Sequence, residues 1–335
     1  MTSILTYHEI NQQQWQQLIE RSPYATWFQT DEAYRFYQSV CDMQAFAYGV
    51  AEEGQLVGVV VGYTTTEKCK FKQHFTARSI IVGGPLIADN ISNEALTALL
   101  KAVRAMESNG QSPMANRPIY IETRNFHDYS RWKSVFESAG FSYKEHYDIH
   151  VHCSAQHRLS ERRQRELKRA IKNGATVAEA QTEQEIRDWY QILHRLYREK
   201  VRTPLFSEDF FLQFHRNGEG KYLLVKYEGK VIGGMMCPIL DGKAIYEWYV
   251  CGLDEEYRDL YPSVLATHAA IEYAKQNDIP LFDFMGAGEP DVPYGVRDFK
   301  MEFGGELKEF GRFLCVRKPL LYWIGKMGVK WLKRK

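Results

Sequence analysis

The sequence lacks the cysteine patterns that mark a disulfide framework or a zinc site. Its six cysteines include no CxxC pair and no metal-binding spacing. They are Cys41, Cys69, Cys153, Cys237, Cys251 and Cys315. We therefore expect reduced, mostly buried thiols in a cytoplasmic protein, and no bound metal.

Long hydrophobic runs are missing as well. No apolar run reaches the ~18 residues that indicate a membrane-spanning helix. Residues 1–8 contain neither a basic segment nor an apolar core, so no signal peptide is expected.

The motifs of several large enzyme classes are also absent. The chain contains no GxSxG, HExxH, GxxxxGKS/T or GxGxxG sequence. Nothing therefore points to an α/β-hydrolase, a zinc protease, a P-loop NTPase or a dinucleotide-binding enzyme. The Gly286-Ala287-Gly288 segment is followed by acids and prolines, which do not open a phosphate-binding helix. We interpret it as a shaped loop at the carboxyl end of a strand over 281–284.

What is present is typical of a folded protein with two domains. The 335 residues are 44% hydrophobic and 25% charged, which allows each half to bury a core of its own. The net charge of +1 conceals two basic segments, residues 158–172 and 314–335, and the second contains no acidic residue. Such segments predict an anionic partner at two places: RNA, a nucleotide or a membrane surface.

The two halves of the chain resemble each other. Residues 48–59 align with residues 223–234, each spanning a Glu-Gly turn between two apolar runs. The aligned positions include Gly54 and Gly229, Gly58 and Gly233, and Lys133 and Lys300. Both halves predict a hairpin, a strand, a helix, a strand, a helix and a strand in that order. The fold class is therefore expected to be α/β (α+β), with two copies of one unit.

Domain boundaries and strands follow from this repeat. The expected parts are a first domain over 1–155, a basic linker helix over 156–175, a second domain with the site over 176–316, and a basic amphipathic tail over 317–335. The expected strands of the second copy include 243–251, 281–284 and a single last strand over 306–316.

Lys300 has the surroundings that best fit a catalytic role. It follows Phe299 and precedes a Gly-Gly turn, just after the loop at the carboxyl end of strand 281–284. A lysine ammonium can neutralise the oxyanion of an acyl transfer, and removing such a group typically costs ~3–4 kcal/mol of barrier. The residues alone leave open a surface lysine without a catalytic role. The expected substrate contacts near it are Tyr246, Trp248, Asp283, Glu289, Asp291, Tyr294 and Arg297.

The two basic segments each allow two interpretations. Arg162, Arg165 and Arg169 recur at helical spacing, which predicts either a phosphate or tRNA contact or a solvated linker helix. The tail predicts a helix with Leu320, Ile324, Met327 and Trp331 on one face and lysines on another. It either packs on the protein or lies on an anionic membrane.

Four segments make the chain resemble the Fem-type aminoacyltransferases, a branch of the GNAT superfamily of N-acyltransferases. They are the basic helix and its exit over 162–177, the hairpin residues 229–234, the strand 281–284, and residues 294–304, which contain an F-K-x-x-F-G sequence. The resemblance covers nearly the whole chain. It implies two tandem GNAT-like domains, each a mixed, mainly antiparallel sheet flanked by helices.

The resemblance also implies an activity. Fem-type enzymes transfer an amino acid from aminoacyl-tRNA to an amine of a UDP-linked or lipid-linked peptidoglycan precursor, with no cofactor, metal or covalent enzyme intermediate. By the same resemblance, Lys300 and Phe299 form the functional pair beside the tRNA acceptor end. A cytoplasmic enzyme is then expected, with residues 318–335 in peripheral contact with the inner face of the plasma membrane.

Two other functions stay open at this point. One is an acyl-CoA-dependent N-acyltransferase that acts on a sugar or peptide amine. The wider superfamily holds the coenzyme A pyrophosphate on a glycine-containing turn before a helix, and the matching residues 257–263 contain no glycine. The other is a non-catalytic module that binds an anionic ligand.

Overall fold

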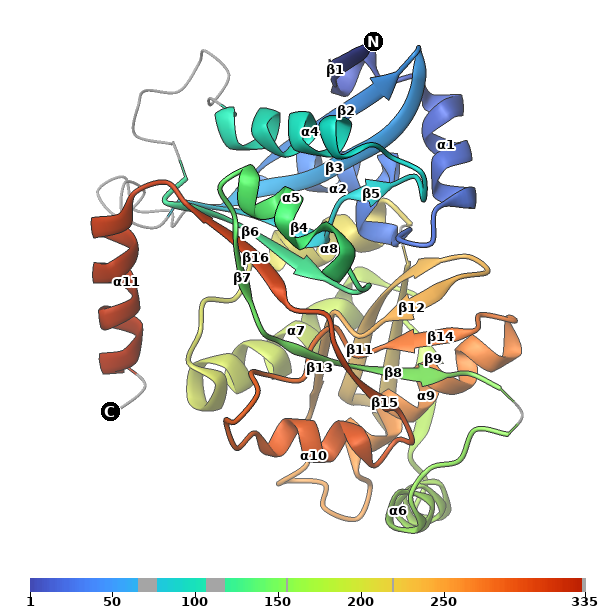
Figure 1. Ribbon diagram of the computed structural model, residues 1–335. Coiled ribbons are helices and arrows are strands. Elements are labelled where there is room, and N and C mark those ends of the chain that lie inside the picture. Colours follow the sequence, from blue (N-terminus) through green and yellow to red (C-terminus); the bar gives the residue numbers. More distant parts are fainter. Residues whose placement is uncertain (66–76, 107–117, 155, 219, 333–335) are drawn as a thin grey trace. The chain divides into compact units, whose positions relative to one another are not determined.

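The computed structural model describes residues 1–65, 77–106, 118–154, 156–218 and 220–332, and side chains up to residue 327 (Figure 1). Cys69 lies outside the described residues. The chain divides into two compact units, which we call unit 1 (residues 1–145 and 310–335) and unit 2 (residues 146–309). The five described cysteines are free thiols, and Cys237, Cys251 and Cys315 are buried.

Unit 1 is a mixed sheet with helices packed on it. Its strands run in the order β1-β2-β3-β4-β6-β16-β7, with β5 paired to β3, and only β4 and β6 are parallel among the pairs described. The strands are β1 (Thr2–Thr6), β2 (Met43–Glu52), β3 (Gln55–Thr65), β4 (Arg78–Gly83), β5 (Leu86–Ile87), β6 (Tyr120–Asn125), β7 (Ser142–Lys144) and β16 (Arg312–Val316). The helices are α1 (Gln12–Arg21), α2 (Asp31–Ser39), α4 (Asn93–Ala105), α5 (Lys133–Ser138) and α11 (Pro319–Leu332).

Unit 2 has the same kind of sheet. Its order is β15-β8-β14-β12-β11-β10-β9, with β13 paired to β11, and only β12 and β14 are parallel among the described pairs. The strands are β8 (Tyr147–His152), β9 (Thr176–Glu179), β10 (Gly220–Tyr227), β11 (Lys230–Leu240), β12 (Ala244–Tyr246), β13 (Tyr249–Gly252), β14 (Leu281–Asp283) and β15 (Glu306–Glu309). The helices are α6 (Glu161–Lys172), α7 (Glu183–Leu196), α8 (Glu208–Arg216), α9 (Pro262–Gln276) and α10 (Gly295–Met301). Two mixed, mainly antiparallel sheets confirm the predicted fold class.

The two predicted hairpins show the repeat most clearly. Glu53 and Gly54 turn β2 into β3 with φ of 51° and 83°, and Glu228 and Gly229 turn β10 into β11 with φ of 48° and 75°. Positive φ at both central residues suits the right-handed twist of the paired strands. Both hairpins also have a register shift, between Val50 and Ala51 in the first and between Val225 and Lys226 in the second. These positions are matched in the sequence alignment of the two copies.

The predicted last strand over 306–316 is wrong, because it is two strands that belong to different units. β15 pairs with β8 in unit 2, whereas β16 pairs with β6 and β7 in unit 1. Gly311 lies between β15 and β16, where the chain passes from one sheet to the other. It has a φ of 65° and lies so close to the Tyr143 ring that a Cβ would not fit. Unit 1 is thus completed by β16, a strand from the far end of the sequence, whereas unit 2 is one continuous segment.

The expected domain boundaries differ from the two units for the same reason. The first boundary falls between residues 145 and 146 rather than at 155, and the second falls between 309 and 310 rather than at 316. The helix expected to be a linker, α6, belongs to unit 2. Its Leu167 and Ala170 are buried in the core of that unit, among side chains from α9, β10 and β11. The tail helix α11 belongs to unit 1.

Candidate active site

The strand expected over 243–251 is interrupted in the middle, and the candidate site lies at the interruption. β12 runs parallel to β14 as far as the pair Tyr246 and Asp283. The backbone N–H of Glu247 still donates to the Asp283 carbonyl at 2.9 Å, but Trp248 donates to Met236 of β11. From there the chain continues as β13, which pairs with β11. Glu247 therefore lies between β12 and β13, at the point where the pairing with β14 ends.

Lys300 lies against this interruption, in the interior of unit 2. Its Nζ is 3.0 Å from Glu247 Oε1 and donates to the carbonyl oxygens of Phe284 at 2.8 Å and Gly286 at 3.0 Å. The residue is 9% exposed. An ammonium has three N–H groups, so these three acceptors use all of them.

This environment differs from the one expected for Lys300 from the sequence. The residue is neither on the surface nor free to meet an acyl oxyanion. Instead it joins the end of β14 to Glu247. A direct hydrogen bond to an oxyanion requires Lys300 to give up one of its present acceptors.

Three more ionisable side chains lie beside this ion pair. Asp148 and His150 come from β8, and Asp283 comes from β14; they are 2%, 6% and 1% exposed. His150 Nε2 is 3.2 Å from Asp283 Oδ2. Asp283 was expected from the sequence as a substrate contact, whereas Asp148 and His150 were missed because 141–152 predicted only an extended segment. The signal available was Asp148 and His150 alternating with Ile149 and Val151, since side chains two apart share one face of a strand.

Burial sets the protonation of this group. It raises the pKa of Asp148 well above its usual value, and the neighbouring Asp283 charge adds to the rise. Burial also raises the pKa of Glu247, although the Lys300 charge and hydrogen bond oppose it. For His150 burial alone lowers the pKa, but the charge and hydrogen bond of Asp283 prevail and the net shift is upward. All three shifts favour bound protons.

Most of the other expected substrate contacts are divided between the core and the surface. Tyr246 is 1% exposed, and Trp248 packs edge-on against Phe210 at 5.1 Å. Glu289, Asp291 and Tyr294 are exposed on the loop between β14 and α10. These three residues are close to Lys300 in the sequence, but their side chains are in solvent.

Arg297, also expected to bind substrate, supports this loop from α10. Its Nε donates to the Ala287 carbonyl at 2.8 Å and its Nη2 donates to the Glu289 carbonyl at 2.5 Å. The guanidinium also lies 4.9 Å from the centre of the Tyr147 ring. These contacts fix the path of the loop rather than leaving the guanidinium free.

Phe299 is covered by a buried arginine that sequence reasoning missed. The Arg163 guanidinium lies 4.3 Å from the centre of the Phe299 ring and forms ion pairs with Glu166 at 2.5 Å and Glu302 at 2.8 Å. Arg163 is 4% exposed. Its contacts with Phe299 and Glu302 join α6 to α10 and the residue that follows it.

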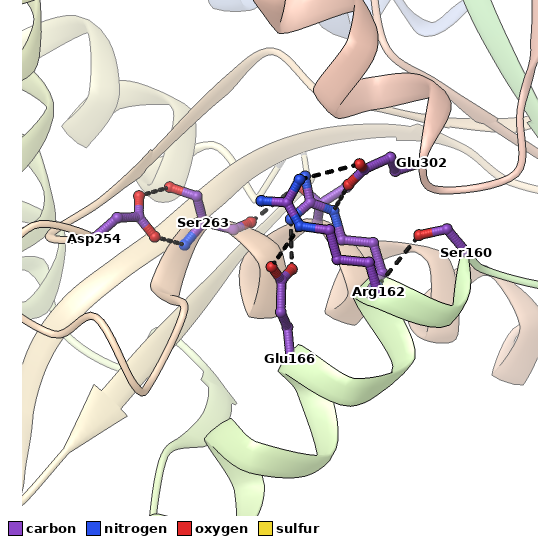
Figure 2. A network of polar contacts seen from close by, with 8 residues as sticks. Ser160, Arg162, Glu166, Asp254, Ser263 and Glu302 are labelled. Atoms are coloured by element: carbon purple, nitrogen blue, oxygen red, sulfur yellow. Dashed lines mark hydrogen bonds and ion pairs between the residues drawn. The ribbon is translucent and has the colours of Figure 1, made fainter.

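The arginines named from the sequence lie on the exposed side of α6. Figure 2 shows Arg162 between Glu166 and Glu302, near the N-cap residue Ser160. Its ion pairs with the two glutamates measure 3.0 and 3.3 Å. Arg169 pairs with Asp259 at 2.8 Å. Arg165 is exposed and forms no ion pair with another described residue. The helix therefore presents positive charge to solvent, although two of its three named arginines also have acidic partners.

The N-terminus of α9 has a carboxylate of the chain itself bound to it. Asp254 accepts the Ser263 backbone N–H at 3.1 Å and the Ser263 hydroxyl (Figure 2). Pro262 is the first helical residue and has no N–H, and Tyr261 before it is left-handed with a φ of 44°. A free helix N-terminus attracts anions because its N–H groups lack partners. Here one donor is absent and the next is taken by Asp254.

Comparison with known proteins fits this architecture. Residues 160–301 match the family described as Acetyltransferase (GNAT) domain. The match covers less than half of the chain and shows a GNAT domain in this segment. The matched segment begins at the N-cap of α6 and ends with α10, so it includes Glu247, Asp283 and Lys300. No curated protein matches the chain.

Solved structures extend the likeness to both units. FemX is 14% identical, with a TM-score of 0.69, over 96% of this chain and 99% of that one. L-PGS from Bacillus licheniformis is 13% identical, with a TM-score of 0.58, over 97% of each chain. A tandem GNAT protein from the clavulanic acid biosynthesis pathway is 10% identical, with a TM-score of 0.55, over 94% of this chain and 98% of that one. The chain thus has a Fem-type tandem GNAT fold.

No described helix has both the length and the apolar character needed to cross a membrane.

Proposed function

We propose that the chain transfers an aminoacyl group from aminoacyl-tRNA to an amine of a peptidoglycan precursor. The proposal combines the Fem-type tandem GNAT fold with a choice of acyl donor. That choice rests on the N-terminus of α9.

The carboxylate of Asp254 on this helix end is the observation that carries the proposal. In the wider superfamily a pyrophosphate binds to N–H groups before the matching helix. In this chain the Asp254 carboxylate would repel such a ligand, and Pro262 has no N–H to donate to it. Like charges at short range oppose binding, so the alternative acyl-CoA donor is disfavoured. An aminoacyl-tRNA ester does not need this cradle.

The reaction itself requires little from the protein. The acceptor amine attacks the ester carbonyl, a C–N bond forms, the ester C–O bond breaks, and the proton from nitrogen goes to the tRNA hydroxyl oxygen. Lys300 is the proposed source of positive charge for the oxyanion, once it exchanges a backbone acceptor for the substrate. Glu289 or Asp291 on the exposed loop is the proposed carrier of the amine proton.

The exposed face of α6 is the proposed contact for the tRNA backbone. Arg162, Arg165 and Arg169 concentrate positive charge there, and arginine forks suit phosphates. Because phosphate contacts release counterions, we expect tRNA binding to weaken steeply as salt rises.

The tail is proposed to hold the enzyme at the inner face of the plasma membrane, where a lipid-linked precursor is found. The exposed apolar residues of α11 and the acid-free segment 314–335 support this contact. Phosphatidylglycerol is a second acceptor for the test, because the chain is also similar in fold to the C-terminal domain of a putative lysylphosphatidylglycerol synthetase from Agrobacterium fabrum.

The experiment is a transfer assay with labelled aminoacyl-tRNA as donor. UDP-linked muropeptide, lipid-linked muropeptide and phosphatidylglycerol are offered separately, and acyl-CoA is offered as an alternative donor. We expect turnover with tRNA and a muropeptide, and a loss of at least 100-fold in Lys300→Met, about the effect of removing one oxyanion donor. Lys133→Met is the matched control, because Lys133 aligns with Lys300 and is exposed in unit 1. Turnover with acyl-CoA alone, or full activity in Lys300→Met, refutes the proposal.

A further inference from the structure

Asp148, His150 and Asp283 form a buried cluster with the geometry of a metal site. Asp148 and His150 are two residues apart on β8 and therefore share one face of that strand. Asp283 lies directly opposite His150 on β14. One oxygen of each carboxylate and one ring nitrogen of the histidine all lie within 4.8 Å of one another.

Backbone N–H groups bind one oxygen of each carboxylate. Asp148 Oδ1 accepts the N–H groups of Ile149 and Gly286, both at 2.7 Å, and Asp283 Oδ1 accepts the N–H of Met285 at 2.6 Å. These bonds fix the orientation of both carboxylates. The Oδ2 atoms of Asp148 and Asp283 remain buried. Asp148 Oδ2 has no hydrogen-bond donor among the described residues, and Asp283 Oδ2 has His150 Nε2 beside it at 3.2 Å. Buried carboxylate oxygens without donors are costly unless a cation or a proton meets them.

The charges around the cluster leave room for one divalent cation. Three carboxylates are buried together, those of Asp148, Asp283 and Glu247, and Lys300 pairs with Glu247. Two negative charges then remain for Asp148 and Asp283. Either two protons, one on His150 and one on Asp148, or a single divalent cation with neutral His150 makes the group neutral.

We propose that a divalent cation of the zinc type binds between Asp148 Oδ2, His150 Nε2 and Asp283 Oδ2. One imidazole nitrogen and two carboxylate oxygens are a ligand set that zinc accepts. Two ligands of one zinc ion lie at most ~4.2 Å apart, twice the metal–ligand distance. The widest pair of the cluster must therefore draw in by less than ~1 Å. The Oδ1 bonds to the backbone are the outer contacts that orient such ligands.

The site has a structural consequence for the loop after β14. Asp148 and Asp283 hold the N–H groups of Met285 and Gly286, while Lys300 holds the carbonyls of Phe284 and Gly286. An ion that locks both carboxylates therefore fixes the loop that leads to Glu289. The inference does not depend on which acyl group the protein transfers.

The test uses the full chain, stripped with a chelator and titrated with zinc alone. We expect one equivalent per chain and a melting temperature raised by roughly 5–10 °C at 100-fold excess over Kd. Asp148→Asn keeps the Oδ1 acceptor and His150→Gln keeps a polar side chain, and each should abolish the effect. His152→Gln is the matched control, because His152 is on the same strand but its side chain is 65% exposed.

The outcomes separate cleanly, and none of them uses activity. Wild-type protein that shows no saturable zinc binding overturns the proposal even if the variants do not fold. Binding that persists in Asp148→Asn, or that disappears in His152→Gln, places the metal elsewhere and overturns it as well. Transfer activity with no zinc binding refutes this inference alone and leaves the proposed function standing.

Discussion

Lys300 shows how much of a side chain's role depends on its partners. Its ammonium is buried with Glu247, whose side chain is 5% exposed, and with two backbone carbonyls. Removing one partner of a buried ion pair leaves an uncompensated charge, which costs far more than the pair itself contributes. Stability and catalysis at this residue are therefore separable by experiment.

At the residue scale we predict the behaviour of a double mutant. Lys300→Met should lower the free energy of unfolding by about 3–5 kcal/mol, because Glu247 is left buried and unpaired. Adding Glu247→Gln should recover most of that loss, since Glu247 is then no longer an unpaired buried charge. Urea denaturation of the two single variants and the double variant measures the cycle.

The same proteins also decide whether the positive charge is needed for transfer. If Lys300 stabilises the oxyanion, the double variant is stable but inactive. If Lys300 only positions the loop after β14, activity returns together with stability. Lys133→Met should lower the unfolding free energy by no more than about 1 kcal/mol, the range for an exposed cation–π contact, because the Lys133 ammonium lies 4.6 Å from the centre of the Tyr143 ring.

At the element scale, the parts that could be predicted are those with a local cause. The hairpins β2–β3 and β10–β11 follow from Glu-Gly turns between apolar runs, and both were predicted. The break between β12 and β13 could not be predicted, because Tyr246 to Tyr249 has good strand propensity. The break coincides with contacts far away in the sequence, chiefly from Glu247 to Lys300.

The candidate site shows the same limit. Lys300 and Asp283 were found from the sequence because they follow or end a recognisable strand, but their burial was not. Asp148 and Arg163 were missed because each has one partner on a distant part of the chain: Gly286 for Asp148, and Glu302 for Arg163. The division of 306–316 between two sheets was missed for a similar reason, since a glycine in an extended segment does not say which sheet follows it.

A second prediction at this scale concerns the ion pair that links α7 to β10. Glu185 pairs with Lys226, and the hydrogen bond from Lys226 is the largest cause of the lowered pKa of Glu185. A carboxyl with a lowered pKa binds fewer protons when folded, so it stabilises the fold above its ordinary value of 4.5. That contribution is lost as the pH falls below 4.5 through the folded pKa.

We therefore expect Glu185→Gln to lower the unfolding free energy at pH 7 by up to ~1 kcal/mol, the range for a partly exposed pair. The difference from wild type should shrink steadily below pH 4.5. Denaturation curves at several pH values measure this. Glu228→Gln, in the exposed turn that follows β10, is the control. A difference that is constant with pH contradicts the assignment.

At the scale of the whole molecule, charge and apolar surface coincide at the C-terminal helix. Leu320, Trp323, Ile324 and Met327 of α11 are 70%, 61%, 49% and 52% exposed. Their spacing places them along one stripe of a helix. Tyr322 is half-buried and meets the Tyr120 ring of unit 1 at 5.4 Å, so another side of α11 is the one that packs. The sequence predicted such a stripe from Leu320, Ile324, Met327 and Trp331 but did not identify Trp323; the side chain of Trp331 lies outside the described part of the chain.

This surface predicts binding to anionic vesicles. Each lysine or arginine near such a surface contributes about 1 kcal/mol, and the buried apolar area adds to it. The full chain should pellet with vesicles containing phosphatidylglycerol, less at high salt, and hardly with phosphatidylcholine alone. Deletion of residues 319–335 should abolish pelleting, and Trp323→Ala with Ile324→Ala should weaken it at unchanged charge. Tyr322→Phe keeps the ring that packs on unit 1 and should pellet like wild type. If the deletion pellets as well as the full chain, the exposed stripe has another purpose and the enzyme has no membrane contact through α11.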